Sequence, residues 1–235
     1  MAATVLALEP MRRVLVTGGN SGIGLALCTQ LVCEDGCFVY LGSRSAERGQ
    51  DAVAAIQAKA GEGAAANVEL VVIDVADDAS VASAAVAVAA SLAAAGAATG
   101  GAPASLYGIV NNAGTGLQHK VGPDVVVNVN LFGPRRVCSA FLPLLQPVGG
   151  RVVNVGSGAG PMFVAAQAPS LQRRLVAAPG SWAEVEALIA EGLPLDPKGG
   201  YGISKVRRRG WHGERGGVVI GCSIVPRFCW RLYIA

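Results

Sequence analysis

The sequence predicts an α/β protein with a doubly wound parallel sheet covered by helices on both faces. Short apolar runs alternate along the chain with longer segments that have helical spacing. Each run is apolar throughout, which is typical of strands buried on both faces. With 235 residues, 52% of them hydrophobic, the chain is long enough for one domain with a full core. We therefore expect a single domain over residues 1–235, with a sheet that is incomplete at its C-terminal edge.

The first half of the expected sheet begins with RRVLVTGG (12–19), a short buried strand that ends in glycines. A helix over 21–32 should follow, since Ile23, Leu27 and Leu31 have helical spacing. The second strand is expected in CFVYLGSR (37–44), and Ser45 is placed to cap the helix that comes after it. The third strand is expected in VELVVIDVAD (68–77).

The second half begins with an Ala-rich helix and a fourth strand in LYGIVNNAG (106–114). A helix over 129–146 and a fifth strand in GRVVNVGSGAG (150–160) complete the pattern. Residues 161–200 are too many for an ordinary connection and are interpreted as a helical insertion. Within it, Ser181 as N-cap, Glu184 three residues later and Gly192 as a stop predict one short helix.

The net charge of +3 hides an uneven distribution. The last 31 residues carry seven basic residues and one acidic residue, a charge of +6, which leaves −3 for residues 1–204. The part after Lys205, an atypical basic tail (206–235), has no aromatic interleaving and no zinc-ligand spacing, so we expect no nucleic-acid partner. Residues 79–119 carry no charge, but they are mostly Ala, Ser and Gly and contain Pro103. We expect a buried helix there and no membrane span.

The six cysteines lack paired metal spacing, and the N-terminus has no charged region followed by a long apolar run. Reduced thiols and a cytoplasmic protein are therefore expected. Cys33 and Cys37 are interpreted as small buried hydrophobes. His119 and His212 have no carboxylate or nucleophile spaced to work with them, so we expect no catalytic role for either and no metal site.

The motif TGGNSGIG (17–24) lies between a strand and a helix, where glycines let the backbone approach a pyrophosphate and the helix N-terminus presents free N–H groups. A tight turn needs glycine for its geometry alone, so the motif by itself is weak evidence. Its spacing also departs from G-x-G-x-x-G. The residues expected to contact a nucleotide here are Gly18, Asn20, Ser21, Gly22, Ile23 and Gly24.

Four motifs in order, TGxxxGxG, NNAG after the fourth strand, a serine after the fifth and then YxxxK, resemble the short-chain dehydrogenase/reductase family. The resemblance covers roughly residues 12–205. The insertion before the tyrosine is similar to that of monomeric carbonyl reductases and related plant ketone reductases. The resemblance implies a Rossmann-like fold, a monomer, and hydride transfer between a nicotinamide cofactor and a small-molecule ketone or aldehyde.

The end of the second strand indicates which cofactor is used. An NAD enzyme of this architecture places a carboxylate there for the adenosine ribose, whereas this chain has Ser43 followed by Arg44. A guanidinium can pair with a 2′-phosphate, so NADP (NADPH) is favoured, with Arg48 as a weaker candidate. The resemblance also implies adenine contacts at Asp74 and Val75, although a lone Asp at a strand end is usually a turn or cap residue. It further implies a ribose-facing wall formed by Asn111, Ala113 and Gly114, which could also be a simple turn.

Reduction puts negative charge on the substrate oxygen, so the site needs a proton donor. A free tyrosine, with a pKa near ~10, is a weak acid, and a lysine ammonium four residues later on the same helix face favours the phenolate. We therefore assign Tyr201 as general acid and Lys205 as its electrostatic partner, and we expect both to contact the cofactor, Lys205 at the nicotinamide ribose. The resemblance implies that Ser157 holds the substrate oxygen and Asn130 a water behind the lysine. Taken singly, each residue has an ordinary structural explanation.

The resemblance stops after Lys205, where VRRRGWHGERGG has no apolar stripe and four glycines. We expect the helix to end near Arg209 and GVVIGCSIVP (217–226) to supply a sixth strand, with too few residues left for a lid and a last strand. Two hypotheses follow. One is an NADP-dependent carbonyl reductase. The other is a catalytically impaired chain that binds only nucleotide or a protein partner, being either a truncated isoform or the product of a gene read through the wrong frame or an intron.

Overall fold

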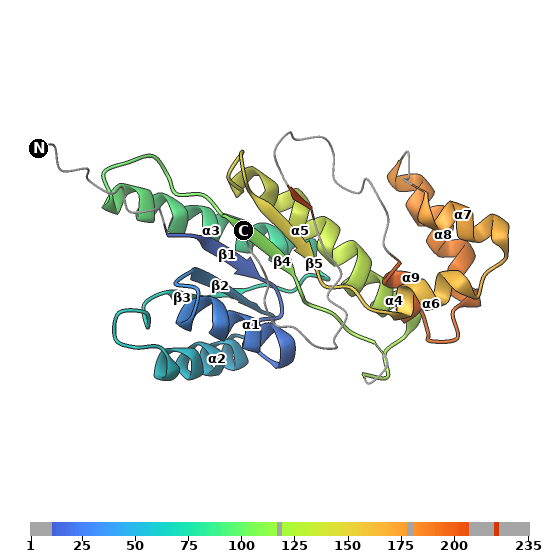
Figure 1. The fold of residues 1–235 in the computed structure, drawn as a ribbon, viewed down its shortest axis with the longest axis horizontal. Helices are drawn as coiled ribbons and strands as arrows, with labels where there is room; N and C mark the ends of the chain where they lie inside the picture. Colours follow the sequence, from blue (N-terminus) through green and yellow to red (C-terminus); the bar gives the residue numbers. More distant parts are fainter. Residues whose placement is uncertain (1–10, 117–118, 178–180, 207–218, 221–235) are drawn as a thin grey trace, which may run out of the picture.

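The computed structural model describes residues 11–116, 119–177, 181–206 and 219–220. A parallel sheet with strand order β3-β2-β1-β4-β5-β6 forms its centre (Figure 1). Because β1 lies between β2 and β4, the chain reverses direction across the sheet after β3, as the doubly wound prediction requires. The strands are β1 (Arg13–Val16), β2 (Phe38–Ser43), β3 (Val68–Val72), β4 (Gly108–Asn111), β5 (Arg151–Asn154) and β6 (Val219–Ile220).

Helices cover both faces of the sheet (Figure 1). On one face, α1 (Gly22–Cys33) and α2 (Ala46–Lys59) bury Leu27, Leu31 and Ile56 against β1 and β2. On the other, α3 (Asp78–Ala98) and α5 (Gly133–Phe141) bury Val88 and Phe141. The fold class predicted from the sequence is therefore confirmed.

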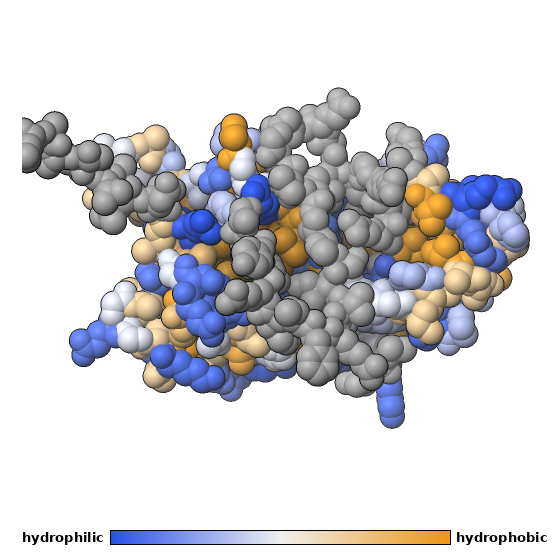
Figure 2. All heavy atoms as spheres, viewed as in Figure 1, coloured by the Kyte–Doolittle hydropathy of each residue, from blue (hydrophilic) through white to orange (hydrophobic). Residues whose placement is uncertain are grey.

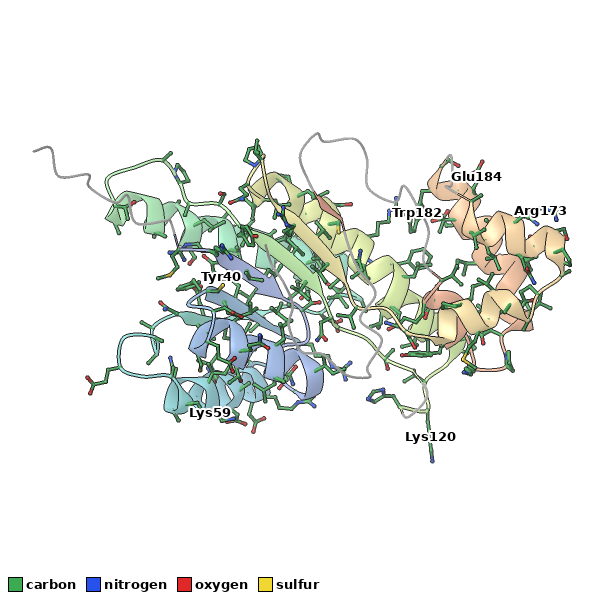
Figure 3. All side chains as sticks on the ribbon, in the orientation of Figure 1. Tyr40, Lys59, Lys120, Arg173, Trp182 and Glu184 are labelled. Carbon is green, nitrogen blue, oxygen red and sulfur yellow. The ribbon has the colours of Figure 1, made fainter. Side chains whose placement is uncertain are left out.

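Tyr40 of β2 shows how the sheet and α3 are joined (Figure 3). Its ring is fully buried, and its hydroxyl donates to Ser91 Oγ over 3.1 Å. Ser91 in turn donates to Glu69 Oε2 over 2.8 Å. A buried tyrosine hydroxyl needs such a partner, so this chain of hydrogen bonds fixes α3 over the sheet.

The Ala-rich helix α3 is only partly buried, although the sequence predicted a buried helix. Only one stripe, which includes Val81, Val88 and Leu92, faces the sheet, and Val86 is 72% exposed on the outer side. Of the described helices, α3 alone has the length and apolar composition of a membrane span, with 28% of its most apolar window buried. Alanine packs close to a sheet yet tolerates water, so an uncharged sequence did not require burial on all sides.

The single helix predicted over 129–146 is divided into three pieces, and a short helix that the sequence did not predict, α4 (Pro123–Val127), precedes them. The three pieces are a π-helical turn η1 (Asn128–Phe132), α5 and a short 3₁₀ turn η2 (Leu142–Leu144). Pro134 and Pro143 lack the N–H that a continuous helix would use there, and the π turn precedes the first of them. The π turn is also where Asn130 lies.

The described part of the insertion contains two helices and a 3₁₀ turn, and a third helix that starts at Ala159 leads into it, where the sequence predicted one helix. They are α6 (Ala159–Ala165), α7 (Pro169–Val176), α8 (Trp182–Gly192) and η3 (Leu193–Leu195). The predicted cap is confirmed, since Ser181 Oγ accepts a hydrogen bond from the Glu184 N–H at 3.3 Å. Figure 1 shows these helices together at one end of the molecule, beyond the carboxyl ends of the strands.

Trp182 joins the insertion to the rest of the domain (Figure 3). Its ring meets Phe132 edge-on at 5.7 Å between centroids, and the Arg135 guanidinium lies 4.1 Å above it. The insertion helices share a separate apolar cluster with α4, η1 and the helix α9 (Tyr201–Ser204), and this cluster includes Leu131, Leu175 and Ile203. Through this cluster the insertion packs against α4, η1 and α9.

The helix that carries the Tyr-x-x-x-Lys pair is shorter than predicted. The helix α9 spans Tyr201–Ser204, and Lys205 is its C-cap, so it does not continue toward Arg209, which lies outside the described residues. The N–H groups of Lys205 and Val206 bond the carbonyls three residues back, which tightens the last turn. The sixth strand is confirmed at Val219–Ile220, which pairs parallel to β5, and the rest of 217–226 is not described.

Cys33 is exposed, which corrects its assignment as a buried hydrophobe. Cys28, Cys37 and Cys138 are buried, and all four are free thiols. Cys33 ends α1 and lies off the stripe of Leu27 and Leu31 that faces the sheet. Figure 2 shows that hydrophilic and hydrophobic residues are mixed on the outer surface of the described chain in this view.

Candidate active site

The turn between β1 and α1 has the shape of a phosphate cradle. Gly18 and Gly22 adopt φ of +65° and +52°, which favour glycine. A Cβ on Gly24 would collide with the Gly18 carbonyl oxygen, so the helix approaches the turn more closely than any side chain would allow. Ser21 is the N-cap of α1, but its side chain makes no capping bond, and Ser21, Gly22 and Ile23 are exposed. The start of a 12-residue helix is thus open to a ligand.

Asn112 is a site residue that the sequence reasoning missed. Its Nδ2 donates to the carbonyls of Thr17 at 2.9 Å and Gly18 at 3.1 Å. Thr17 Oγ1 accepts the N–H groups of Asn112 and Ala113, both at 3.1 Å. The NNAG turn is therefore bound directly to the glycine turn. The doubled Asn in NNAG was the available signal, because one amide can face the interior while the next crosses to β1.

The end of β2 lies beside the same turn, since the Gly19 N–H donates to the Gly42 carbonyl at 2.8 Å. Ser43 is buried, and its hydroxyl donates to the Ser45 carbonyl at 2.8 Å. Arg44 is exposed. Ser45 caps α2 through the Arg48 N–H, and Arg48 is exposed one turn into that helix. At this edge the structure places an exposed guanidinium next to a buried, neutral hydroxyl.

Asp74 and Val75 both have structural roles after β3. Asp74 Oδ1 accepts the Ala76 N–H at 2.9 Å, which is the turn-residue alternative recognised from the sequence. Val75 is buried, and a Cβ added to Gly133 would lie 3.0 Å from its Cγ2. Any contact of Val75 with a ligand must therefore use its backbone.

Asn111 does not face the open end of the sheet. It is 4% exposed, and its Nδ2 donates to Asn154 Oδ1 at 2.8 Å and to Cys138 Sγ at 3.5 Å. Its Oδ1 has no hydrogen-bond partner among the described residues. Ala113 and Gly114, by contrast, lie beyond the strand end, and Gly114 is exposed. The NNAG turn therefore presents its last two residues to the site and turns its first side chain inward.

Asn130 lies in the π turn and holds the segment after NNAG. Its Oδ1 accepts the Thr115 N–H and its Nδ2 donates to the Thr115 carbonyl, both at 2.8 Å. The same Nδ2 donates to Ser204 Oγ at 3.1 Å, and Ser204 donates to the Tyr201 carbonyl at 2.9 Å. Asn130 is 6% exposed and thus links the NNAG segment to α9. Ser204, inside the Tyr-x-x-x-Lys motif, was not assigned from the sequence.

Tyr201 and Lys205 lie on the side of α9 that faces this segment. A Cβ on Gly116 would collide with the Tyr201 ring, so the ring packs flat on the chain there. Lys205 Nζ lies 5.8 Å from the centre of that ring and donates to the Val155 carbonyl at 3.3 Å. Burial lowers the pKa of Lys205 from its ordinary value of 10.5, because desolvation disfavours the ammonium form.

Ser157 lies in the loop between β5 and α6, next to the lysine. Its Oγ accepts the Ala159 N–H at 3.2 Å. A Cβ on Gly160 would collide with the Lys205 carbonyl oxygen, so this loop and the end of α9 are in close contact. The structure thus brings Asn130, Ser157, Tyr201 and Lys205 together at the carboxyl ends of β4 and β5.

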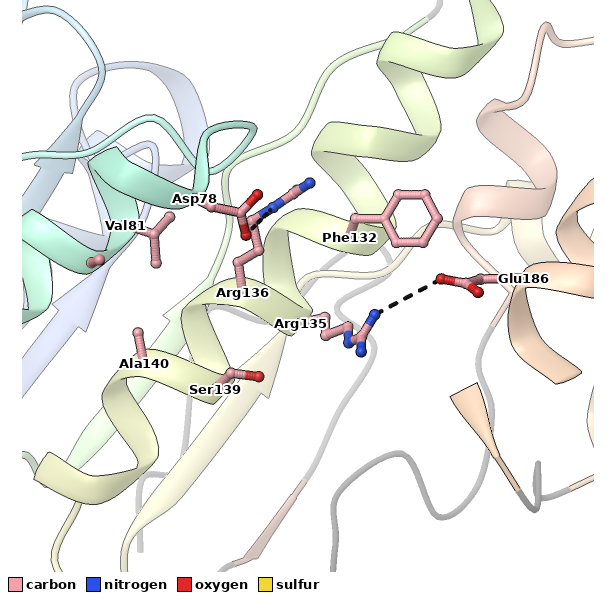
Figure 4. Close-up of a pocket in the computed structure, with 9 residues that line it drawn as sticks. Asp78, Val81, Phe132, Arg135, Arg136, Ser139, Ala140 and Glu186 are labelled. Atoms are coloured by element: carbon pink, nitrogen blue, oxygen red, sulfur yellow. Dashed lines mark ion pairs between the residues drawn. The ribbon is translucent and has the colours of Figure 1, made fainter. Parts of the chain in front are cut away.

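A cleft of about 720 Å³ lies elsewhere, between α3, α5 and α8 (Figure 4). Two ion pairs cross it, Arg136 with Asp78 at 3.0 Å and Arg135 with Glu186 at 4.0 Å. These charges cancel, and no residue of the candidate active site lines the cleft. Within the described ranges, no group of three or more His, Cys, Asp or Glu side chains could hold a metal ion.

Comparison with known proteins indicates the family of this chain. Residues 12–169 match the sequence model of the short chain dehydrogenase family. The human protein "Carbonyl reductase [NADPH] 1" is 30% identical over 220 residues, which are 91% of this chain and 72% of that protein. "(+)-Neomenthol dehydrogenase" of Arabidopsis thaliana is 32% identical over 171 residues, 66% of this chain. The match spans only 56% of the Arabidopsis protein.

Solved structures show the same fold. The menthone neomenthol reductase of Mentha piperita superimposes with a TM-score of 0.70 at 24% identity, covering 84% of this chain and 82% of that one. The Pseudomonas aeruginosa RhlG/NADP complex gives a TM-score of 0.52 at 28% identity, covering 67% and 56%. With its family-model match, its parallel sheet and its ordered motifs, this chain belongs to the short-chain dehydrogenase/reductase family of oxidoreductases.

Proposed function

We propose that the protein is an NADP-dependent carbonyl reductase that transfers hydride from NADPH to a small ketone or aldehyde. The observation that carries this proposal is the grouping of Tyr201, Lys205, Ser157 and Asn130 beside an open glycine turn. Its relatives in humans and Arabidopsis are named as an NADPH carbonyl reductase and a neomenthol dehydrogenase. Both names describe chemistry on a carbonyl and its alcohol.

The residues around the glycine turn fit such a cofactor. Gly18, Gly22 and Gly24 leave a cradle that a Cβ would fill or strain, and the exposed N–H groups at the start of α1 suit a pyrophosphate. Arg44, with Arg48 one turn further, would hold a 2′-phosphate, and the buried Ser43 offers no carboxylate to repel it. Gly114 leaves space next to Lys205 for the ribose nearest the reacting ring.

When bound, NADPH supplies the hydride. The chain's own residues then control the proton and the position of the carbonyl. Tyr201 donates its phenolic proton to the carbonyl oxygen as negative charge develops there, and the Lys205 ammonium stabilises the phenolate that remains. Ser157 donates a hydrogen bond to the same oxygen. Asn130 keeps α9 and the NNAG segment in register while the proton moves.

We further propose a cytoplasmic monomer with no nucleic-acid or membrane partner. The four free thiols among the described residues suit a reducing compartment. The insertion, which is similar to that of monomeric carbonyl reductases, packs Trp182 against Phe132 of η1 and Arg135 of α5. Size-exclusion chromatography with light scattering would measure the mass directly.

The function is tested by measuring cofactor binding and turnover on the same samples. Fluorescence titration should show tighter binding of NADPH than of NADH, and Arg44→Ala should remove that preference while leaving NADH binding unchanged. Turnover of ketones or aldehydes should disappear in Tyr201→Phe and fall sharply in Lys205→Ala and Ser157→Ala. NADPH binding should survive best in Ser157→Ala, because that serine contacts substrate only. Full activity in Tyr201→Phe would rule out the assigned acid.

A second candidate function is nucleotide binding without catalysis. It is favoured by one observation, that α9 ends at Ser204 and leaves Lys205 as its C-cap, outside the helix. The glycine turn, Asn112 and Arg44 do not depend on α9. Tight NADPH binding with no turnover of any carbonyl compound would therefore favour this second function.

A further inference from the structure

Asp196 is a buried carboxylate that the insertion places beside α9. The residue is 7% exposed, and both of its oxygens are in use. Oδ1 accepts the Lys198 N–H at 2.9 Å, and Oδ2 accepts the Ile203 N–H at 2.8 Å. Asp196 thus connects the end of the insertion to the middle of the segment that carries Tyr201 and Lys205.

The bond to Ile203 replaces a missing helix cap. Ile203 is the third residue of α9, and the N–H at that position is normally satisfied by the side chain of the residue just before the helix. That residue is Gly200, which has no side chain and adopts φ of +82°. A Cβ there would also lie 2.9 Å from Leu193 Cδ1. The cap is therefore supplied by Asp196, four residues earlier in the chain.

The surroundings of Asp196 leave little room for α9 to move. A Cβ on Gly202 would lie 3.0 Å from each Asp196 oxygen and 2.9 Å from the Phe163 Cβ. Phe163 belongs to α6, which follows the Ser157 loop. Gly202 of α9 is thus in close contact with both the Asp196 carboxylate and α6.

We propose that Asp196 is a positioning residue for catalysis, through which the insertion fixes the orientation of Tyr201 and Lys205. Ile203 lies midway between them, two residues from each, and a helix of four residues has few internal bonds of its own to hold its orientation. The proposal rests on the proposed function, in which Tyr201 is the acid. It assigns Asp196 no contact with substrate or cofactor.

Steady-state kinetics test the proposal with Asp196→Ala, Asp196→Asn and a matched control, Ser181→Ala. The control also removes a helix-capping side chain from the insertion, but on α8. We expect Asp196→Ala to lower kcat by about 10-fold to 100-fold, because small misplacements of reacting groups have effects of this size. The KM for NADPH should change by less than about twofold, since the glycine turn and Arg44 lie on other elements. Asp196→Asn keeps one acceptor oxygen and should recover part of kcat, and Ser181→Ala should keep all of it.

Fluorine NMR of protein made with 3-fluorotyrosine gives a readout that does not need turnover. The Tyr201 resonance is assigned by its loss in Tyr201→Phe. In Asp196→Ala it should shift or broaden, while those of Tyr40 and Tyr107 stay in place. An unchanged Tyr201 resonance together with an unchanged kcat would overturn the proposal, as would equal effects of Asp196→Ala and Ser181→Ala.

The proposed function and the proposed role of Asp196 would be refuted by different results. If the wild-type chain binds NADPH but reduces no carbonyl compound, the proposed function is wrong, and the Tyr201 resonance still decides whether Asp196 positions α9. If Asp196→Ala does not fold, the nearly isosteric Asp196→Asn carries the test, with a smaller displacement of the same resonance expected. An unchanged resonance in a folded Asp196→Asn would then count against the proposal.

Discussion

Lys205 shows how one buried side chain can set the working pH of the site. Its ammonium is paired with the Val155 carbonyl rather than with a carboxylate, so within the described part of the chain no opposite charge offsets its desolvation. Burial consequently lowers its pKa below the ordinary 10.5. The charge that we propose assists Tyr201 is therefore lost at a lower pH than an exposed lysine would lose it.

This predicts an alkaline limit on catalysis. We expect kcat/KM for carbonyl reduction to fall as pH rises through a value below 10.5, because deprotonated Lys205 no longer stabilises the phenolate. Lys205→Arg keeps its charge throughout this range and should move the limit to higher pH, at a reduced maximal rate since a guanidinium differs in shape. The dependence of kcat/KM on pH, measured for the wild-type protein and for Lys205→Arg, checks this prediction. Coincident alkaline limits would show that another group is responsible.

The lowered pKa of Lys205 also determines how this residue affects the free energy of unfolding at different pH values. The pKa of Lys205 is lower in the folded state than in the unfolded state, so the unfolded chain binds this proton more tightly. Its contribution to the free energy of unfolding is unfavourable at neutral pH and improves as pH rises from the folded pKa toward 10.5. Lys205 thus lowers the stability of the folded protein at neutral pH, as is common for functional groups.

At the scale of elements, the β1–α1 turn is held by contacts that leave no room for a side chain. A Cβ on Gly24 would collide with the Gly18 carbonyl oxygen and lie 2.5 Å from Asn112 Nδ2. The same Nδ2 bonds the Thr17 and Gly18 carbonyls. A substitution at Gly24 would therefore move the helix, the turn and the NNAG segment together.

We expect Gly24→Ala to destabilise the protein by about 1–3 kcal/mol through overpacking. It should also weaken NADPH binding by about tenfold or more, since the turn can no longer close on the pyrophosphate. Urea unfolding and fluorescence titration measure the two effects. Gly61→Ala is the matched control, because a Cβ there would meet nothing within 4 Å. Equal stability of the two variants would contradict the account.

Local signals in the sequence predicted the elements well, because they act over a few residues. The caps at Ser45 and Ser181 and the apolar strands needed no knowledge of distant parts of the chain. Asn111 and Asp196 could not be predicted in this way. The direction of Asn111 depends on Asn154, 43 residues away, and the role of Asp196 depends on the missing side chain at Gly200. Pro134 and Pro143 were local signals for the division of the helix over 129–146, but the π turn also holds Asn130, whose partners Thr115 and Ser204 are distant in the sequence.

At the scale of the whole molecule, the proposed cofactor site and the proposed catalytic site differ in how many buried elements support them. The glycine turn, Asn112 and Arg44 rest on β1, β2 and β4, which are buried in the sheet. Tyr201 and Lys205 rest on a four-residue helix held by Asp196, Asn130 and α6. Binding and turnover should therefore respond differently to changes in the C-terminal region.

We expect the unaltered chain to bind NADPH well and to be a poor catalyst. Replacing residues 206–235 by a helix-forming, family-like region should extend α9 and raise kcat by about 100-fold, with little change in NADPH affinity. Comparison of kcat, cofactor titration and light scattering for the two proteins checks this. If the unaltered chain is monodisperse, unfolds cooperatively and turns over substrate as fast as the extended version, its own C-terminal residues are a working part of the enzyme.

The buried thiol of Cys28 gives the molecule a built-in chemical reporter. Its Sγ lies under the glycine turn, 2.9 Å from where a Cβ on Gly19 would be, and burial raises its pKa to about 12. Alkylating reagents react with thiolates, so Cys28 can be modified only when α1 lifts from the sheet, whereas the exposed Cys33 on the same helix is modified at once. Mass spectrometry that locates the label on each cysteine over time would then record, within one sample, how often the glycine-turn end of the domain opens.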